Sequence, residues 1–255
     1  MRLLVLLVLL PVQAEAQARP FVFSVTTTTA GSAEDWTAHY DVGFAEHTAD
    51  PFGYEGLEQR VGIQGSLGAG FTLLGQLGLG VGETTGTSST QEAEVLKDIV
   101  VYPSGLRLAA GLGMRREWQG ETTLLGRVSL GRATRRFLLF GNLRLERPFA
   151  EGRDELDLIT SLGWLHRVGS SVHLGVEALG EDLEGFWEEE EAEGGAKLFV
   201  GPSVRWARSG GRLYASLCGG PIFYATRSDR SSLAPRPLGA GGNGFTVRLS
   251  LGLAF

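Results

Sequence analysis

Apolar and polar residues alternate along most of this chain with a repeat of two. In residues 245–255 the six odd positions hold Phe, Val or Leu, and the even positions hold small or polar residues. This repeat is that of an extended strand, whose successive side chains point to opposite faces. The same alternation recurs in one segment after another from Trp36 onward. The pattern therefore predicts an all-β protein.

Twelve such segments, each of eleven to thirteen residues, can be placed on the chain. They span 36–46, 56–67, 70–82, 92–102, 105–116, 121–132, 135–147, 154–166, 171–181, 195–207, 211–223 and 244–255. Strands that cross an outer membrane need about 9 to 11 residues, whereas strands of soluble proteins average about 5 to 6. Short connections of two to four residues alternate with longer ones of four to twenty. We therefore predict a transmembrane up-and-down antiparallel β-barrel of about 12 strands, with 10 or 14 as alternatives.

Two features of the chain fit this barrel poorly. Segment 92–102 has no clearly apolar face, because Lys97 and Asp98 are adjacent. Pro202 and Pro221 lie inside expected strands, where each removes a hydrogen bond from the ladder. We interpret the two prolines as bulges or as errors in the strand boundaries.

Aromatic residues gather at both ends of the expected strands. The end with short turns holds Trp36, Phe71, Tyr102, Phe137, Trp164, Trp206 and Phe255. The end with long loops holds Phe44, Trp118, Phe149, Phe223 and Phe245. Two such rows are typical of the aromatic girdles that lie at the two surfaces of a membrane.

Over roughly residues 36–255 the chain resembles bacterial outer-membrane β-barrel proteins as a class. In that class a terminal aromatic residue that closes an alternating strand is part of the signal read by the barrel-assembly machinery. Phe255, with Leu253 and Leu251, resembles this signal. The resemblance implies a location in the bacterial outer membrane, with the lipid bilayer, lipopolysaccharide and the assembly machinery as partners. It is a likeness of architecture and transfers no functional residues.

The N-terminus has the pattern of a secretory signal peptide. Arg2 is followed by the apolar run 3–10, and residues 16–18 form a small-x-small cleavage site. We predict a signal peptide over 1–18, a periplasmic tail over 19–35 and the barrel over 36–255.

Composition and charge exclude several functions. The 255 residues include 23 Lys and Arg against 29 Asp and Glu, for a net charge of −6, so no basic excess favours a nucleic-acid partner. The single cysteine, Cys218, excludes a cysteine-based zinc site and an intrachain disulfide. We expect neither a metal nor a cofactor.

The polar faces of the strands predict a charged lumen. Nine bases and seven acids are expected to point inward, too many for a dry core. Most lie toward the long-loop end, above an inner half lined by small residues such as Ser129, Gly163 and Gly252. We predict a narrow passive pore for small polar solutes, with a weak anion preference. Its candidate constriction comprises Arg60, Arg127, Arg144, Asp157, Glu177, Lys197 and Arg248.

Two other functions stay open at this point. The charges could pair into a closed plug, which would make the protein a structural or surface-binding barrel that presents the acidic loop 182–194 and the loop 224–243. A hydrolase is the weaker alternative. It is suggested by His47, which lies near Asp50 in the sequence, and by Glu155 and Asp157, which are expected at the same rim of the barrel. No G-x-S-x-G nucleophile motif is present, so we predict no catalytic residues.

Overall fold

The computed structural model describes residues 36–46, 56–82, 86–117, 122–149, 156–181, 183, 197–207, 212–224 and 243–255. The predicted signal peptide and periplasmic tail lie outside these residues, as does nearly all of the two loops 182–194 and 224–243. Within the described ranges no helix is both long enough and apolar enough to cross a membrane.

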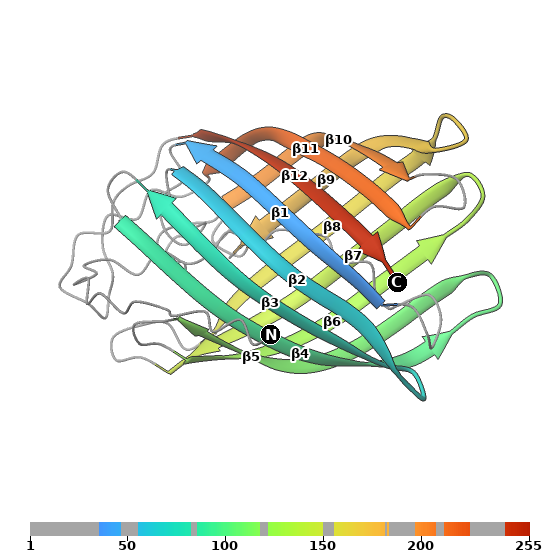
Figure 1. Ribbon diagram of the computed structural model, residues 1–255, viewed down its shortest axis with the longest axis horizontal. Helices are drawn as coiled ribbons and strands as arrows, with labels where there is room; N and C mark the ends of the chain where they lie inside the picture. The colour runs from blue at the N-terminus through green and yellow to red at the C-terminus, as the bar shows by residue number, and fades with distance from the viewer. Residues whose placement is uncertain are drawn as a thin grey trace, which may run out of the picture.

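Twelve antiparallel strands form one closed barrel (Figure 1). Each strand pairs with its neighbours in the sequence, and the first pairs with the last. The strands are β1 (Trp36–Glu46), β2 (Gly56–Gly68), β3 (Phe71–Gly82), β4 (Gly86–Val101), β5 (Leu106–Glu117), β6 (Thr122–Ala133), β7 (Phe137–Pro148), β8 (Asp157–Arg167), β9 (Val172–Glu181), β10 (Lys197–Ala207), β11 (Leu213–Tyr224) and β12 (Gly244–Ala254). The predicted twelve-strand up-and-down topology is confirmed.

The seam between β1 and β12 closes the barrel. Their register places Tyr40 opposite Leu251. At the end of the seam, the Trp36 amide donates to the Phe255 carbonyl at 3.2 Å, and the Phe255 amide donates to the Trp36 carbonyl at 2.8 Å. Because these bonds pair the last backbone groups of the two strands, no free strand edge remains along this seam.

Strand β4 departs most from its expected range. Eleven expected ranges match the observed strands to within three residues at each end, but β4 begins at Gly86, six residues before the expected start at 92. Its early residues are polar, and they continue the backbone ladder with β3, which pairs Thr87 with Val81. Ladder bonds do not depend on side-chain polarity, so the apolar pattern could not reveal this extension. A register shift between Asp98 and Val100 marks a bulge at the other end.

The two prolines are not bulges, and the boundaries around them were not misplaced. Between β10 and β11, Phe199 pairs with Ile222 and Ser203 with Cys218, which is the same register, and the three intervening pairs are missing. Pro202 and Pro221 both lie in this interval. The prolines therefore open a short gap in one ladder while both strands continue.

The outer surface of the barrel is apolar. Leu77, Leu112 and Leu162, from strands β3, β5 and β8, expose 55–68% of their surface. The girdle candidates at the short-turn end occupy strand ends, where Phe71, Trp164 and Trp206 are exposed and Trp36 and Phe137 are half-buried. At the other end Phe44, Phe149, Phe223 and Phe245 are exposed. Trp118 lies outside the described residues.

Candidate functional site: the barrel lumen

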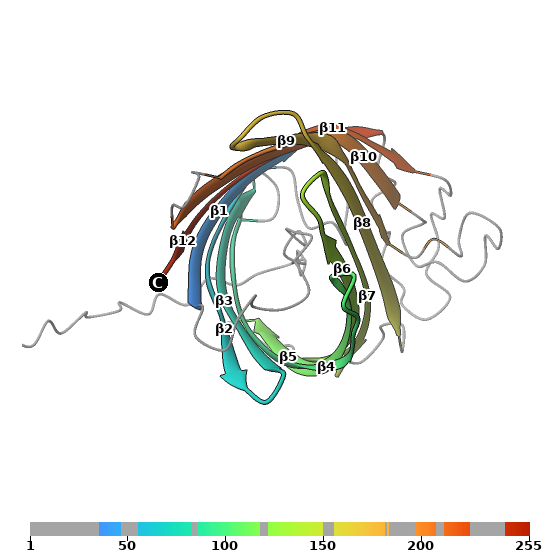
Figure 2. The same cartoon turned by 90° about the vertical axis from the view of Figure 1, so that its right-hand side faces the viewer.

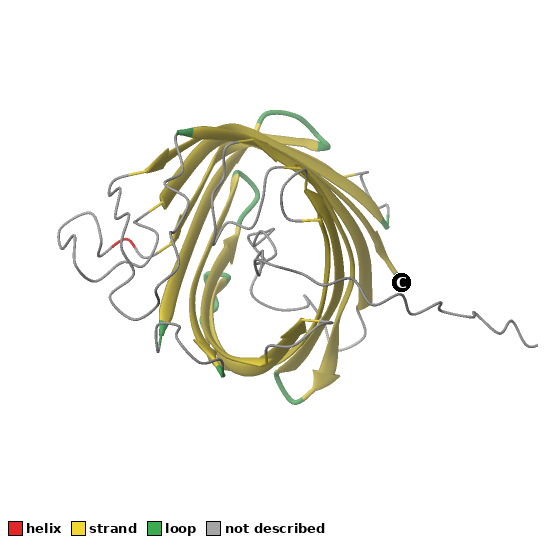
Figure 3. Cartoon of the chain, turned by 90° about the vertical axis from the view of Figure 1, so that its left-hand side faces the viewer, coloured by secondary structure: helices red, strands yellow, loops and turns green. Residues whose placement is uncertain are grey.

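In the described part of the chain, strands alone form the wall around the lumen (Figures 2 and 3). Viewed from the short-turn end, β1 to β3 face β6 to β8, while β4 and β5 close one side and β9 to β11 the other (Figure 2). Charged side chains on the inner face are buried, seven acidic and six basic. They are Asp41, Glu58, Arg60, Glu94, Arg115, Arg127, Arg144, Glu146, Asp157, Glu177, Glu181, Lys197 and Arg248. All seven candidate constriction residues are in this set.

Six residues form a continuous network that we call the β4–β7 cluster. It comprises Glu92, Glu94, Arg115, Arg127, Arg144 and Glu146. Arg127 donates two hydrogen bonds to Glu94, of 2.8 and 2.5 Å. Arg144 donates to Glu92 at 3.2 and 2.5 Å and lies 3.0 Å from Glu146. Arg115 completes the cluster by an ion pair of 2.7 Å with Glu146.

The β4–β7 cluster is balanced, with three acids and three bases. Paired arginine–carboxylate contacts of this kind are directional and strong when water is partly excluded. Its members come from four adjacent strands, β4 to β7, which together form one side of the wall (Figure 2). Such a cluster can narrow the passage and present alternating charge to a passing solute.

A second ion pair lies on the opposite side of the wall. Arg248 on β12 donates to Glu177 on β9 at 2.7 Å, and the Ser203 hydroxyl donates to the same carboxylate at 2.5 Å. The Arg248 guanidinium also lies 5.5 Å from the centre of the Phe199 ring. Each charge of this pair therefore has a partner of opposite charge, while the buried Arg248 Nε has no hydrogen-bond partner.

The remaining constriction candidates are not in these two clusters. Arg60 pairs with Glu58 on its own strand at 2.7 Å and donates to Gln76 at 3.3 Å. Asp157 and Lys197 start β8 and β10, at the long-loop end of the barrel. The sequence thus identified residues of one lumen but could not say which of them make contact.

Sequence analysis missed Glu92 and Glu94, which supply two of the three carboxylates in the β4–β7 cluster. Neither face of β4 is uniformly apolar, so the period of two did not show which face is inward. The available signal was the register with β3, where Glu94 pairs with the inward-facing Leu74. That register is a property of the folded sheet.

Glu92 and Glu94 correct the predicted excess of basic over acidic side chains in the lumen. The buried set holds seven acids against six bases, and the partly buried residues add the acid Glu92 and the base Arg205. Charge counting therefore gives no ground for the weak anion preference that the sequence predicted. The inner face is close to balanced in charge in the described part of the wall.

Apolar residues also point inward. One buried group joins Leu74, Leu96 and Ala109, and another joins Ile159, Leu179, Phe199, Cys218 and Ile222. Glycines of the inner half are covered by larger neighbours. A Cβ atom on Gly163 would lie 1.8 Å from the Phe140 ring, and one on Gly252 would lie 2.0 Å from the Tyr214 ring. The space beside Gly163 and Gly252 is therefore occupied by the Phe140 and Tyr214 rings.

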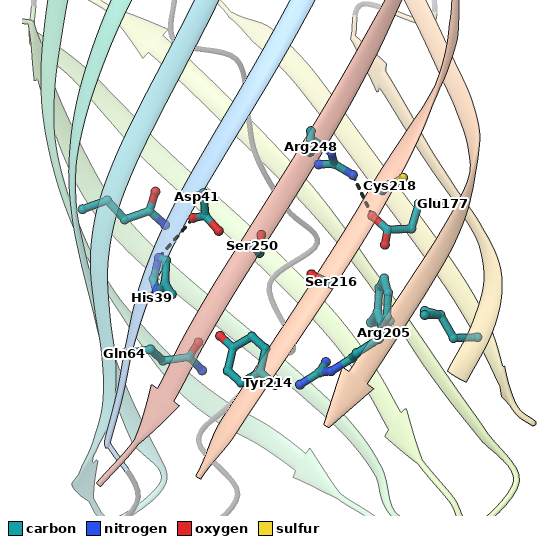
Figure 4. A pocket seen from close by; sticks show the side chains of 13 residues that line it. His39, Asp41, Gln64, Glu177, Arg205, Tyr214, Ser216, Cys218, Arg248 and Ser250 are labelled. Atoms are coloured by element: carbon teal, nitrogen blue, oxygen red, sulfur yellow. Dashed lines mark hydrogen bonds and ion pairs between the residues drawn. The ribbon is translucent and has the colours of Figure 1, made fainter. Parts of the chain in front are cut away.

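A cavity of about 110 Å³ lies on the short-turn side of the Glu177–Arg248 pair (Figure 4). Polar groups from many strands converge on it, including Gln64 of β2, Arg205 of β10 and Tyr214 of β11. His39 and Asp41 also line it, with 3.6 Å between the His39 Nε2 and an Asp41 oxygen. The cavity is therefore part of the lumen.

Neither a metal site nor the suggested hydrolase site is found among the described residues. In the described ranges no group of three or more His, Cys, Asp or Glu side chains is placed to hold a metal. His47, Asp50 and Glu155 lie outside those ranges, so the suggested acid–histidine arrangement is not placed. Asp157, its fourth member, is buried in the wall.

Comparison with known proteins supports the fold. A scan against protein-family models and a search of curated proteins give no match. The NanC porin aligns with a TM-score of 0.59 at 9% identity, over 85% of this chain and 98% of that one. An outer membrane channel from Pseudomonas putida F1 gives 0.59 at 9%, over 89% and 100%. The KdgM porin, in complex with disordered oligogalacturonate, gives 0.55 at 11%, over 86% and 99%. The chain thus has the fold of bacterial outer-membrane β-barrels, as its sequence resemblance implied.

Proposed function

We propose that this protein is a narrow outer-membrane channel through which small polar solutes diffuse passively. The observation that carries the proposal is the contrast between the two faces of the wall. The inner face holds seven buried acids and six buried bases, whereas the outer face exposes large apolar residues. A lumen with this many charges favours water and polar solutes over a dry core. The structural neighbours support the proposal, since two are named porins and one a channel.

The proposal includes a location and partners. The apolar exterior and the two rows of aromatic residues suit a barrel that sits in the outer membrane, in contact with lipid and with lipopolysaccharide. Phe255, Leu253 and Leu251 expose 45–57% of their surface on the outer face, and we propose them as the residues that the barrel-assembly machinery reads. A diffusion channel needs no catalytic residue and no cofactor, and we propose none.

Single-channel recording tests the proposal. The protein is refolded in detergent, and a heat-dependent shift in gel mobility establishes that the barrel has formed. Folded protein is then added to a planar bilayer in potassium chloride. We expect stable current steps of uniform size. Silence from folded protein would rule out a pore.

A non-conducting barrel is the second candidate, and the β4–β7 cluster favours it. The pairs in this cluster reach over intervening strands and cover one side of the lumen. If they plug the passage, wild-type protein is silent and the double variant Glu92→Ser, Arg144→Ser conducts. If both proteins conduct, the cluster is a lining and the channel proposal stands.

A further inference from the structure

Arg205 differs from the other arginines that line the lumen. Arg115, Arg127, Arg144 and Arg248 each lie within 2.5–2.7 Å of a carboxylate oxygen. Arg205 has no ion pair with any residue in the described part of the chain. Its guanidinium instead lies 4.9 Å from the centre of the Tyr214 ring. Figure 4 shows the two side chains together in the passage, on the short-turn side of Arg248.

The surroundings of Arg205 are polar and mostly neutral. The residues opposite it in the two ladders are His173 on β9 and Ser216 on β11. Ser216 and Gln64 line the same cavity as Arg205. On the other flank, His173 Nδ1 is buried and has no hydrogen-bond partner. A cation without an ion pair in the described part of the chain therefore stands beside a buried nitrogen that has no hydrogen-bond partner.

Two carboxylates line the same cavity as Arg205. Glu177 accepts hydrogen bonds from Arg248 and Ser203, whereas an Asp41 oxygen lies 3.6 Å from His39 Nε2. Arg205 is half-buried and lines the cavity without an ion pair in the described part of the chain, so its guanidinium is the group in the cavity that remains open to pairing with an anion.

We propose that Arg205 binds the carboxylate of small hydroxylated organic acids as they pass through the lumen. The planar guanidinium fork matches a carboxylate in geometry, and contact with the Tyr214 ring holds its plane in place. The amide of Gln64 and the hydroxyls of Tyr214, Ser216 and Ser250 line the same cavity and suit the hydroxyl groups of such a solute. This inference rests on the proposed channel function and names the solute class for it.

Binding at this site must be weak. A channel passes a solute only if the solute enters readily and leaves quickly. Replacing the guanidinium by a neutral group removes hydrogen bonds to a charged partner, which corresponds to about a tenfold loss of affinity. Lysine keeps the charge but not the planar fork, so Arg205→Lys is expected to fall between the wild type and Arg205→Gln.

The test compares D-gluconate with D-glucose, which is similar in size but neutral. Saturation-transfer NMR on the detergent-folded protein measures binding without requiring conduction. Bilayer recording then measures how each solute reduces the potassium chloride current. We expect gluconate, and not glucose, to bind and to reduce the current. Arg205→Gln is expected to weaken the binding about tenfold.

Arg212→Gln is the matched control, because Arg212 is exposed at the same end of the barrel and does not line the cavity. It removes the same charge and is expected to leave gluconate binding unchanged. Equal losses in Arg212→Gln and Arg205→Gln would overturn the site in favour of a general electric field. Wild-type protein that binds gluconate no better than glucose would also overturn it.

The two proposals fail in different ways. Conduction without preference for gluconate would leave the channel standing and remove the Arg205 site. Silence in the bilayer with gluconate binding that depends on Arg205 would remove the channel and keep the site.

Discussion

Glu92 on β4 and Arg144 on β7 form an ion pair of 2.5 Å although two strands, β5 and β6, lie between theirs. Adjacent strands lie about 4.8 Å apart, so such a contact along a flat sheet would need a span of some 14 Å. The inward curve of the wall brings the two side chains together over its inner face. The pair therefore reports the curvature of the barrel as well as the chemistry of its lumen.

Neutralising Glu92 should make the channel more selective for anions. Glu92→Gln removes a negative charge beside Arg144. The nearest carboxylates to the Arg144 guanidinium are then those of Glu146, at 3.0 Å, and Glu94, at 3.8 Å. The reversal potential in a salt gradient should shift toward that of the anion. Glu92→Asp keeps the charge and should retain the wild-type value. A shift toward cations in Glu92→Gln would contradict the assignment of this residue to the conducting passage.

Removing Arg144 should destabilise the barrel. Arg144→Met leaves the carboxylates of Glu92 and Glu146 without their shared partner, and breaking a buried pair on one side costs about 3 kcal/mol. Urea unfolding of the refolded protein, followed by tryptophan fluorescence, measures the loss. Adding Glu92→Gln to this variant should restore part of the stability, because one uncompensated charge disappears. A single variant as stable as wild type would show that water in the lumen already solvates these carboxylates.

An alanine at position 163 should displace Phe140. The Phe140 ring occupies the space of the missing Cβ, at 1.8 Å, and Phe140 also lines the cavity near Arg205. Gly163→Ala should lower the free energy of unfolding by about 1–3 kcal/mol, the usual effect of overpacking. Phe140→Ala combined with Gly163→Ala should unfold at a urea concentration close to that of Phe140→Ala alone. Equal losses from Gly163→Ala with and without Phe140 would contradict the contact.

Deleting Phe255 should impair assembly of the barrel. The deletion removes both backbone hydrogen bonds with Trp36 at the seam and the terminal aromatic residue. In a Gram-negative host we expect less protein with the heat-dependent mobility shift of a folded barrel. Phe149→Ala is the control, because Phe149 is an exposed aromatic residue at the opposite end. Normal assembly of the deletion variant would argue against the terminal signal.

The sequence was sufficient for the strands and for most of their orientation. In β12, Thr246 and Arg248 are buried on the inner face, while Phe245, Leu249 and Leu251 are exposed on the outer one, as the period of two predicts. Side-chain direction follows from backbone geometry alone, and a lipid-facing wall demands apolar residues on one face. Local pattern therefore carries this information.

The pattern failed where the two faces of a strand do not differ in polarity. In β4 the inner face joins Glu94 to the apolar Leu96, and the outer face joins Gln91 to Val95. The register with β3 decides which face is inward, and register depends on the partner strand. For this reason the carboxylates of Glu92 and Glu94 appeared only in the folded barrel.

The sequence by itself determined an all-β chain with strands long enough to cross a membrane, an apolar outer face and many of the charged residues that line the lumen. Tertiary structure decided which charges meet: Arg144 with Glu92, Arg248 with Glu177, and Arg205 with no carboxylate among the described residues. The physical reason is that strand period is a local property, whereas contacts across a lumen depend on register and curvature. Both are set by how all twelve strands close.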